Sequence, residues 1–438
     1  MPIVRPFRAL RYDPETIGDV AAVISPPYDV VSPEQRERLA ARHARNFVRI
    51  DLPREELGDP PDERYRRAAR EFVAWRSDGT LRRDPRPSVY AYEQRYRLPG
   101  ATAERRQRGF FARVRLEPPG PGSGVLAHER TLSAPREDRY RLLRATGACL
   151  SPIVLLYRDG GGRDAAALET LAAGAPAIDV SDDDGVRHRA WIVPADGPRA
   201  ATVTALLEAV SAGPLTIADG HHRYETALRY RAERRAGTGS EEDPPFDYAL
   251  ALFFDTSTTP LTVLPTHRLV LGGSSGSATD ELLACAREYF EVEPSTPEAL
   301  TARFGPATQA AGGRFGLLTR AGAYLLTERP ERIEPLLDPS LGRALRGLDV
   351  TRLQAALRPL FGIDPAVAEA GGRVGYTKEV AEARRAVESG EAVAAFLLAP
   401  TPVESVIAVA AEGDVMPQKS TYFHPKPASG LVIDPLES

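Results

Sequence analysis

The residues Leu215-Thr-Ile-Ala-Asp-Gly-His-His-Arg-Tyr-Glu225 decide how the middle of this chain folds. Their first four residues predict a short buried strand, and Asp219-Gly220 permits a tight turn, after which a helix begins at once. His221, His222 and Arg223 therefore lie in the first helical turn, where backbone N–H groups are unpaired and the helix dipole is positive. Cationic side chains oppose that dipole unless a negative ligand offsets them, so we interpret this corner, with Gly220 as its turn, as a phosphate-binding site.

Asp219 ends the strand and is expected to face the bound phosphate. A carboxylate in that place suits either Mg²⁺ coordination or proton abstraction from an attacking hydroxyl. The alternative is an ordinary turn at Asp219-Gly220 followed by a satisfied surface pair of histidines. A zinc site is disfavoured, because the adjacent His221 and His222 point to different sides and His128-Glu129 lacks the second histidine of a His-Glu-x-x-His helix.

Composition excludes several classes of protein. The 438 residues suffice for two to three domains, and 42% hydrophobic with 26% charged residues is typical of globular proteins. A net charge of −4 gives no general reason to bind nucleic acid. Cys149 and Cys285 are the only cysteines, which excludes a disulfide framework. Without an apolar run of ~18–20 residues or a signal-peptide pattern, the sequence predicts a cytoplasmic protein with no membrane partner and leaves its oligomeric state open.

Lysine is rare in this chain. Of the 56 basic residues, all are arginine except Lys378, Lys419 and Lys426. An ammonium group is a compact point charge that a planar guanidinium does not replace, so a retained lysine is a candidate site residue. Lys419 and Lys426 lie seven positions apart in one segment, and we expect Lys419 to neutralise charge on a transferred group. The alternative is that neutral mutation has not reached these positions.

The fold class is predicted as mixed α/β (α+β). Residues 1–95 are expected to form an N-terminal α/β segment, residues 96–271 a central core that contains the phosphate-binding corner, and residues 278–438 a C-terminal α/β domain after a Gly/Ser-rich linker at 272–277. The Gly-, Asp- and Ala-rich residues at about 159–205 are expected to be an insertion into the core.

Individual elements are also predicted. Ser32 is expected to cap a helix that begins at Pro33 and ends at Arg42. Residues 62–77 have the apolar spacing of an amphipathic helix, and residues 88–97 and 108–117 the alternation of paired strands.

Five motifs carry a family resemblance: Ser25-Pro-Pro-Tyr-Asp29, His128-Glu129-x-Thr131, Ala218-Asp-Gly-His-His-Arg223, Leu264-Pro-Thr-His-Arg268 and Pro417-Gln-Lys-Ser-Thr-Tyr-Phe423. Together they resemble the bacterial and archaeal domain-of-unknown-function family numbered ten-fifteen, over nearly the whole chain. That resemblance implies a family and no activity.

The middle of the chain also resembles the ParB/sulfiredoxin superfamily, whose members bind a nucleotide with a Gly-x-x-Arg element at the start of a helix. Gly220-His-His-Arg223 fits that element, and Asp219 to Arg223 match the free-serine kinases of this superfamily letter for letter. The resemblance implies a ParB/sulfiredoxin-like core, an ATP or ADP donor with Mg²⁺, and a base upstream that deprotonates the serine hydroxyl. By its place before a helix and a Pro-Ile strand, Glu129 takes that role.

We therefore expect a nucleotide-dependent phosphotransferase that acts on a small hydroxyl substrate, with free L-serine as the best single candidate. The alternative is a CTP- or ATP-binding switch or a nucleotide hydrolase with the same phosphate site but no use for a base. A DNA-binding regulator is the weakest hypothesis. The residues expected to support the site or bind the substrate are Asp29, His128, Thr131, Arg139, His267, Arg268, Ser420 and Thr421.

Overall fold

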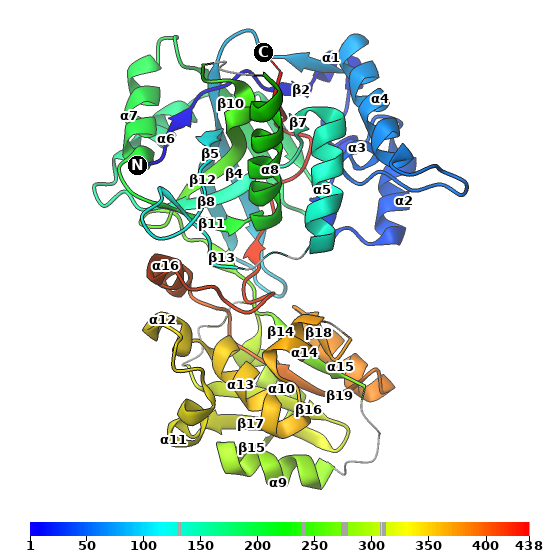
Figure 1. Cartoon of the computed structure of the whole chain (residues 1–438), viewed down its shortest axis with the longest axis vertical. Helices are drawn as coiled ribbons and strands as arrows, with labels where there is room; N and C mark the ends of the chain where they lie inside the picture. Colours follow the sequence, from blue (N-terminus) through cyan, green and yellow to red (C-terminus); the bar gives the residue numbers. More distant parts are fainter. Residues whose placement is uncertain are drawn as a thin grey trace.

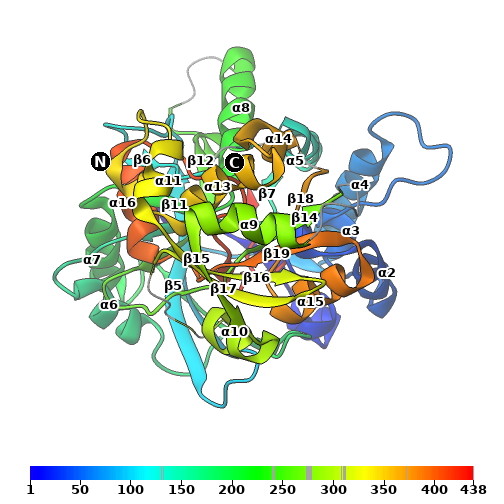
Figure 2. The same ribbon diagram turned by 90° about the horizontal axis from the view of Figure 1, so that it is seen from below.

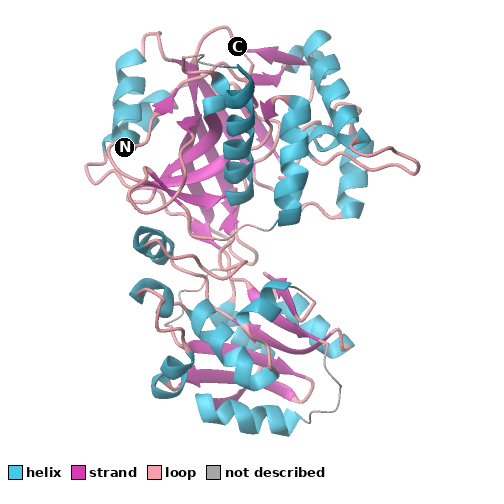
Figure 3. Ribbon diagram, in the orientation of Figure 1, coloured by secondary structure: helices cyan, strands magenta, loops and turns pink. Residues whose placement is uncertain are grey.

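A computed structural model describes residues 1–129, 131, 133–238, 242–272, 279–306, 308, 312–370 and 372–437. The chain folds into two parts, one above the other in Figure 1, each built around its own sheet (Figure 3). The mixed α/β class expected from the sequence is confirmed. Residues 273–277 of the expected linker lie outside the described residues.

The larger part contains a mixed sheet that has nine strands within the described residues. Its strands are β1 (Val4–Arg5), β4 (Ser88–Arg97), β5 (Glu104–Arg115), β6 (Val125–Leu126), β8 (Ile153–Tyr157), β9 (Ile178–Ser181), β10 (Arg187–Pro194), β11 (Leu215–Asp219) and β12 (Tyr248–Asp255). They run in the order β6-β11-β8-β12-β5-β4-β10-β9, and β1 pairs with β5. The expected strand at 88–97 is confirmed, and the one at 108–117 begins earlier, at Glu104.

Helices cover one face of this sheet, and the helices of the N-terminal residues lie beside it (Figure 1). They are α5 (Ser133–Thr146), α6 (Arg163–Leu171), α7 (Ala200–Ser211) and α8 (His221–Thr238), with α1 (Pro14–Ile17), α2 (Pro33–Arg42), α3 (Val48–Asp51) and α4 (Glu63–Ser77) in the N-terminal residues, beside the short pair β2 (Leu10–Tyr12) and β3 (Leu81–Arg83). The predicted helix α2 is confirmed, since Oγ of Ser32 accepts a hydrogen bond from the Gln35 N–H at 3.2 Å. The expected helix at 62–77 is α4, which buries Tyr65, Phe72 and Trp75.

The second part is an antiparallel sheet whose six strands, counted over the described ranges, run in the order β15-β17-β16-β19-β14-β18. The strands are β14 (His267–Leu271), β15 (Phe290–Ser295), β16 (Arg314–Thr319), β17 (Gly322–Glu328), β18 (Val374–Thr377) and β19 (Ala392–Leu397). The helices are α9 (Thr279–Tyr289), α10 (Pro297–Phe304), α11 (Pro330–Ile333), α12 (Arg343–Arg346), α13 (Asp349–Phe361), α14 (Pro365–Ala370), α15 (Val380–Ser389) and α16 (Val403–Glu412). Seen from below, α9 and α13 lie on one face of the sheet, and α10 and α15 on the other (Figure 2).

The C-terminal tail leaves the second part and returns to the first, as the red segment of Figure 1 shows. Its strand β20 (Phe423–His424) pairs with β13 (Thr262–Val263), and β21 (Asp434–Pro435) pairs with β7 (Ala148–Cys149). The buried Asp434 carboxylate accepts hydrogen bonds from Nε and Nη2 of Arg113 at 2.8 and 2.5 Å. The tail is therefore held by backbone pairing with β13 and β7, which lie outside the large sheet, and by a side-chain bond to Arg113 of β5.

The strand pairing can be compared with the segment limits expected from the sequence. The limit placed between residues 95 and 96 falls inside β4, whose residues pair with β5 on one side and β10 on the other. The segment at 159–205 contributes α6, β9, β10 and the start of α7, and so extends the large sheet. Backbone hydrogen bonds between distant segments join these residues into one sheet, and no local sequence pattern indicates such bonds.

Candidate functional site

The corner between β11 and α8 is built around Gly220. Its φ of 92° lies in the left-handed region, and α8 begins at the next residue. The guanidinium group of Arg223 folds back over this glycine, so that a Cβ added at Gly220 would lie 2.8 Å from Nε of Arg223. Only glycine combines this backbone conformation with such a close approach.

Replacing Gly220 by Ala is expected to lower the free energy of unfolding by about 1–3 kcal/mol, because the left-handed conformation is strained and Arg223 must move. Displacing the guanidinium should also weaken phosphate binding. Chemical denaturation and ADP titration measure both effects. Gly213→Ala is the matched control, because no atom lies within 4 Å of its added Cβ. Equal stability and ADP affinity in the Gly220→Ala and Gly213→Ala proteins would contradict this account of the corner.

Asp219 lies between two cations. Its carboxylate forms ion pairs with Arg223, four residues later, and with Lys426 of the tail. Burial alone would raise the pKa of Asp219, but the charges of Lys426 and Arg223 hold it well below its usual range. A carboxylate with so low a pKa is a weak base, so Asp219 suits the positioning of cations better than the proton abstraction expected of it.

Arg223 keeps unused hydrogen-bond donors. Its side chain is 10% exposed, and Nη2 points to Asp219. Nε and Nη1 are buried and have no hydrogen-bond partner among the described residues. Burial favours the neutral form, but the surrounding groups, Asp219 first and then Tyr28 and Asp29, raise the pKa of Arg223 above its ordinary value. A permanently charged fork with two unsatisfied N–H groups is suited to an oxyanion.

The two histidines His128 and His221 pack edge to face, with ring centres 4.6 Å apart. Nδ1 of His128 donates to the Ile217 carbonyl at 2.6 Å, and the His128 backbone N–H donates to Nε2 of His221 at 3.4 Å. Burial lowers the pKa of His128 to about 4 and that of His221 well below its usual value, so both rings are neutral at pH 7. His221, expected to hold phosphate with its ring, therefore uses Nε2 within the protein.

Glu129 follows β6, and β6 runs parallel to β11, so Glu129 and Gly220 leave the sheet at the same edge. The half-buried carboxylate accepts a hydrogen bond at 3.3 Å from the backbone N–H of Lys419, whose φ is 56°. Burial is the main reason that the pKa of Glu129 is raised; Asp219 raises it further, while Lys419 and Lys426 oppose the shift. A carboxylate with a raised pKa is the stronger base of the two candidates.

A layer of buried polar groups lies beneath Arg223. The Arg139 guanidinium sits 3.8 Å from the centre of the Tyr28 ring, and its Nη1 donates to the Asp51 carbonyl at 2.7 Å. Asp51 in turn accepts hydrogen bonds from the hydroxyls of Ser151 and Ser429, both at 3.1 Å. A largely apolar pocket lined by Tyr28, Asp51, Arg139, Ser151 and Arg223 extends from this layer.

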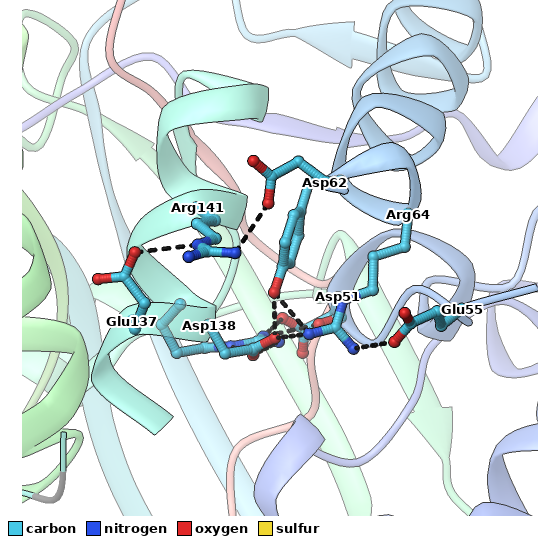
Figure 4. Close-up of polar contacts among 9 residues, drawn as sticks. Asp51, Glu55, Asp62, Arg64, Glu137, Asp138 and Arg141 are labelled. Carbon is cyan, nitrogen blue, oxygen red and sulfur yellow. Dashed lines mark hydrogen bonds and ion pairs between the residues drawn. The ribbon is translucent and has the colours of Figure 1, made fainter. Parts of the chain in front are cut away.

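Figure 4 shows how α4 and α5 hold this layer. Arg64 pairs with Asp138 at 2.9 Å, and Asp138 also accepts hydrogen bonds from Arg139. Arg141 pairs outward with Asp62 at 3.0 Å. Helix α5 therefore takes part in two separate groups of ion pairs, a buried group at Arg139 and an exposed group at Arg141.

The Arg139→Met protein is expected to lose about 3–5 kcal/mol of stability, because Asp51 would be left as an uncompensated buried charge. Asp51 and Arg139 are 3% and 6% exposed, so solvent does not compensate for the loss. Urea unfolding measures the change. Arg141→Met, on the same helix, should leave the midpoint almost unchanged, and equal midpoints for the two variants would refute the importance of the buried pair.

The other expected residues fall into two groups. Near the corner, Thr421 contacts Nε2 of His128 at 3.3 Å, and the exposed Asp29 contributes to the electrostatics of half-buried His222. Thr131 donates to Glu225 at 2.6 Å.

The second group, His267, Ser420 and Arg268, makes its contacts in the second part of the molecule and in the tail. Nδ1 of the buried His267 accepts from the Leu398 N–H at 3.2 Å, which ties together strands of the second sheet. Ser420 donates to the Pro417 carbonyl and shapes the tail turn. Nη1 of Arg268 donates to the Lys419 carbonyl at 3.2 Å, so Arg268 joins the second part to the site.

Comparison with known proteins assigns a family. The family described as "Protein of unknown function (DUF1015)" matches residues 4–351. The chain belongs to this family. The expected family membership is thereby confirmed, and it brings no activity with it. Among curated proteins, none matches the sequence.

Several solved structures are distantly similar to this member of the family. A free serine kinase in complex with AMP is 13% identical over 68% of this chain and 83% of that chain, with a TM-score of 0.34. A conserved hypothetical protein from Pyrococcus furiosus is 14% identical over 71% and 91%, with a TM-score of 0.34. SbnI with a C-terminal truncation, from Staphylococcus aureus, is 10% identical over 72% and 85%, with a TM-score of 0.36. Similarity at this level assigns no role to any residue.

Sequence reasoning left several site residues unassigned. Asp51 gives no local signal, because its partner Arg139 lies far along the chain, and Tyr28 belongs to a quoted motif that indicates no role for its ring. Lys378 did carry a signal, since it is one of three lysines, but it lies apart from the other two in sequence. No helix in the described part of the chain has both the length and the apolar composition to cross a membrane.

Proposed function

We propose that this protein is a nucleotide-dependent phosphotransferase that acts on a small hydroxyl compound, with free L-serine as the first acceptor to test. The proposal includes a ParB/sulfiredoxin-type core around β6, β8, β11 and β12. What carries it is the placement of a carboxylate with a raised pKa, Glu129, at the same sheet edge as the Gly220 corner and its cation Arg223. The letter-for-letter match of Asp219–Arg223 to the free-serine kinase motif supports the same conclusion.

In the proposed reaction the acceptor hydroxyl oxygen attacks the terminal phosphorus of ATP or ADP. A new P–O bond forms, the bond to the departing nucleotide phosphate breaks, and the hydroxyl proton passes to Glu129. Arg223 and the first turn of α8 bind the phosphates, and the ammonium group of Lys419 neutralises charge that develops on the transferred group. Each residue thus has a role that its charge and surroundings allow.

This proposal assigns no protein side chains as Mg²⁺ ligands. Within the described ranges, no three His, Cys, Asp or Glu side chains are arranged as metal ligands. Asp219, the expected ligand, is already paired with Arg223 and Lys426. Nucleotide phosphates commonly carry Mg²⁺ with them, so we assign no step to a protein-bound metal.

The direct test incubates the purified protein with ATP or ADP, Mg²⁺ and a panel of amino acids and small alcohols. Phosphorus NMR should show a new phosphomonoester that depends on both protein and acceptor. Tight nucleotide binding without any phosphorylated acceptor would overturn the kinase proposal and favour a nucleotide-binding switch. Release of inorganic phosphate alone would indicate a hydrolase.

A further inference from the structure

All three lysines of the chain gather around the tail segment 419–426, although one of them belongs to the second part of the molecule. Lys378 lies between β18 and α15, and its Nζ is 4.0 Å from the centre of the Tyr422 ring. Nζ of Lys426 lies 4.9 Å from the same ring centre. Lys419 is bonded through its backbone to Glu129. In a chain that uses arginine for almost every basic position, this convergence marks a place where ammonium groups are required.

Two ammonium groups that share one aromatic ring repel each other. Lys426 is compensated by Asp219, whereas Lys378 has no carboxylate within ion-pair distance among the residues that the structure describes. Burial lowers the pKa of Lys378 and the charge of Lys426 lowers it further, while the more distant Glu379, Glu382 and Asp184 act in the opposite direction. The tyrosine ring offers some stabilisation, but a negative ligand between the two ammonium groups would offer more.

A third cation from the second part faces the same region. Arg268 is 4% exposed, donates to the carbonyls of Thr266 and Lys419, and lies 4.8 Å from the centre of the Tyr376 ring. It too forms no ion pair with a carboxylate in the described ranges. Burial lowers the pKa of Arg268 to about 10, and the charge of Glu129 opposes that shift. The second part therefore presents uncompensated positive charge to the site.

We propose that Lys378 and Lys426, on the Tyr422 ring, form an oxyanion subsite that holds either a nucleotide phosphate or the carboxylate of the acceptor. The subsite deepens the proposed phosphotransferase function and rests on it for the identity of the anion. It gives the second part of the molecule a role in substrate selection, because Lys378 reaches the site only from there. Lysine suits this position because a compact ammonium fits beside an aromatic ring already occupied by a second cation.

The first test labels the intact protein briefly with acetic anhydride and quantifies acetylation at Lys378, Lys419, Lys426 and the N-terminal amine by mass spectrometry. The labelling is repeated with inorganic phosphate, ADP, L-serine and sodium chloride. We expect at least fivefold protection of Lys378 and Lys426, with no protection of the N-terminal amine. Protection by phosphate or ADP identifies a phosphate as the anion, and protection by L-serine alone identifies a carboxylate. Labelling that none of these anions changes at Lys378 overturns the subsite.

The second test uses variants and needs no turnover, so it remains valid if no phosphotransfer is found. Lys378→Gln should weaken binding of the protecting anion about tenfold, and Lys378→Arg should restore only part of that loss, because a planar guanidinium does not fit beside the Tyr422 ring as a compact ammonium does. Arg385→Gln, an exposed position on the neighbouring helix α15, removes one positive charge and should bind as the parent protein does. Unchanged affinity in folded Lys378→Gln, or equal losses in Lys378→Gln and Arg385→Gln, would overturn the proposal. Thermal melts confirm that each variant is folded.

Discussion

Replacing Glu129 by Gln is expected to lower kcat by ~10²–10⁴ while nucleotide affinity stays nearly the same. Glutamine keeps the shape of glutamate and can still accept the hydrogen bond from the Lys419 backbone N–H. It cannot take a proton from the acceptor hydroxyl. Steady-state phosphorylation kinetics and ADP titration separate the two effects.

Glu137→Gln is the matched control for this experiment. Glu137 lies on the exposed side of α5, where it pairs with Arg229 and Arg141, so the same chemical change there should leave kcat unaltered. A loss of ADP affinity in Glu129→Gln as large as the loss of kcat would show that Glu129 maintains the structure of the site. It would then not be the base.

The pH dependence of kcat/KM provides a separate check on Glu129. Its pKa is raised in the folded protein, chiefly by burial, and only the ionised form can accept a proton. Activity should therefore fall as pH decreases through this raised pKa, and the acidic limb should lie at a higher pH than an ordinary glutamate would give. The limb should disappear from the residual activity of Glu129→Gln. A limb that persists in the variant would assign it to another group.

The local elements of the fold are readable from the sequence because their signals are local. Ser32 and Pro33 define the start of α2, and the apolar run at 153–157 is β8. The turn at Gly220 places Arg223 in the first turn of α8, as its neighbours predict. In each case the residues that determine the conformation lie within a few positions of one another.

Strand pairing and ion pairing between residues far apart in the chain could not be predicted from the sequence. The segment at 159–205 supplies β10, which pairs with β4 almost a hundred residues earlier, and no periodicity within the segment indicates a partner. The ion pair of Lys426 with Asp219 joins the tail to the corner in the same way. It also changes the chemistry, because a carboxylate that could serve as a base in isolation becomes one with a strongly lowered pKa.

Replacing Arg223 by Lys is expected to weaken nucleotide binding by about 10–100-fold, which corresponds to about 1.4–2.8 kcal/mol. The guanidinium holds Asp219 with Nη2 and keeps Nε and Nη1 without partners, whereas one ammonium cannot serve the carboxylate and a phosphate in the same fork geometry. Asp219 retains Lys426 in the variant, so the protein should remain folded. Calorimetric titration with ADP measures the loss.

Arg229→Lys provides the comparison on the same helix. Arg229 is about half exposed and pairs with Glu137 at 2.6 Å, so the same substitution there should leave ADP affinity unchanged. Arg223→Lys and Glu129→Gln should also differ in kind, since the first lowers affinity and the second lowers turnover. If Arg223→Lys binds ADP as tightly as the parent protein, the unpartnered donors of Arg223 do not face the phosphates, and the corner at Gly220 serves the fold alone.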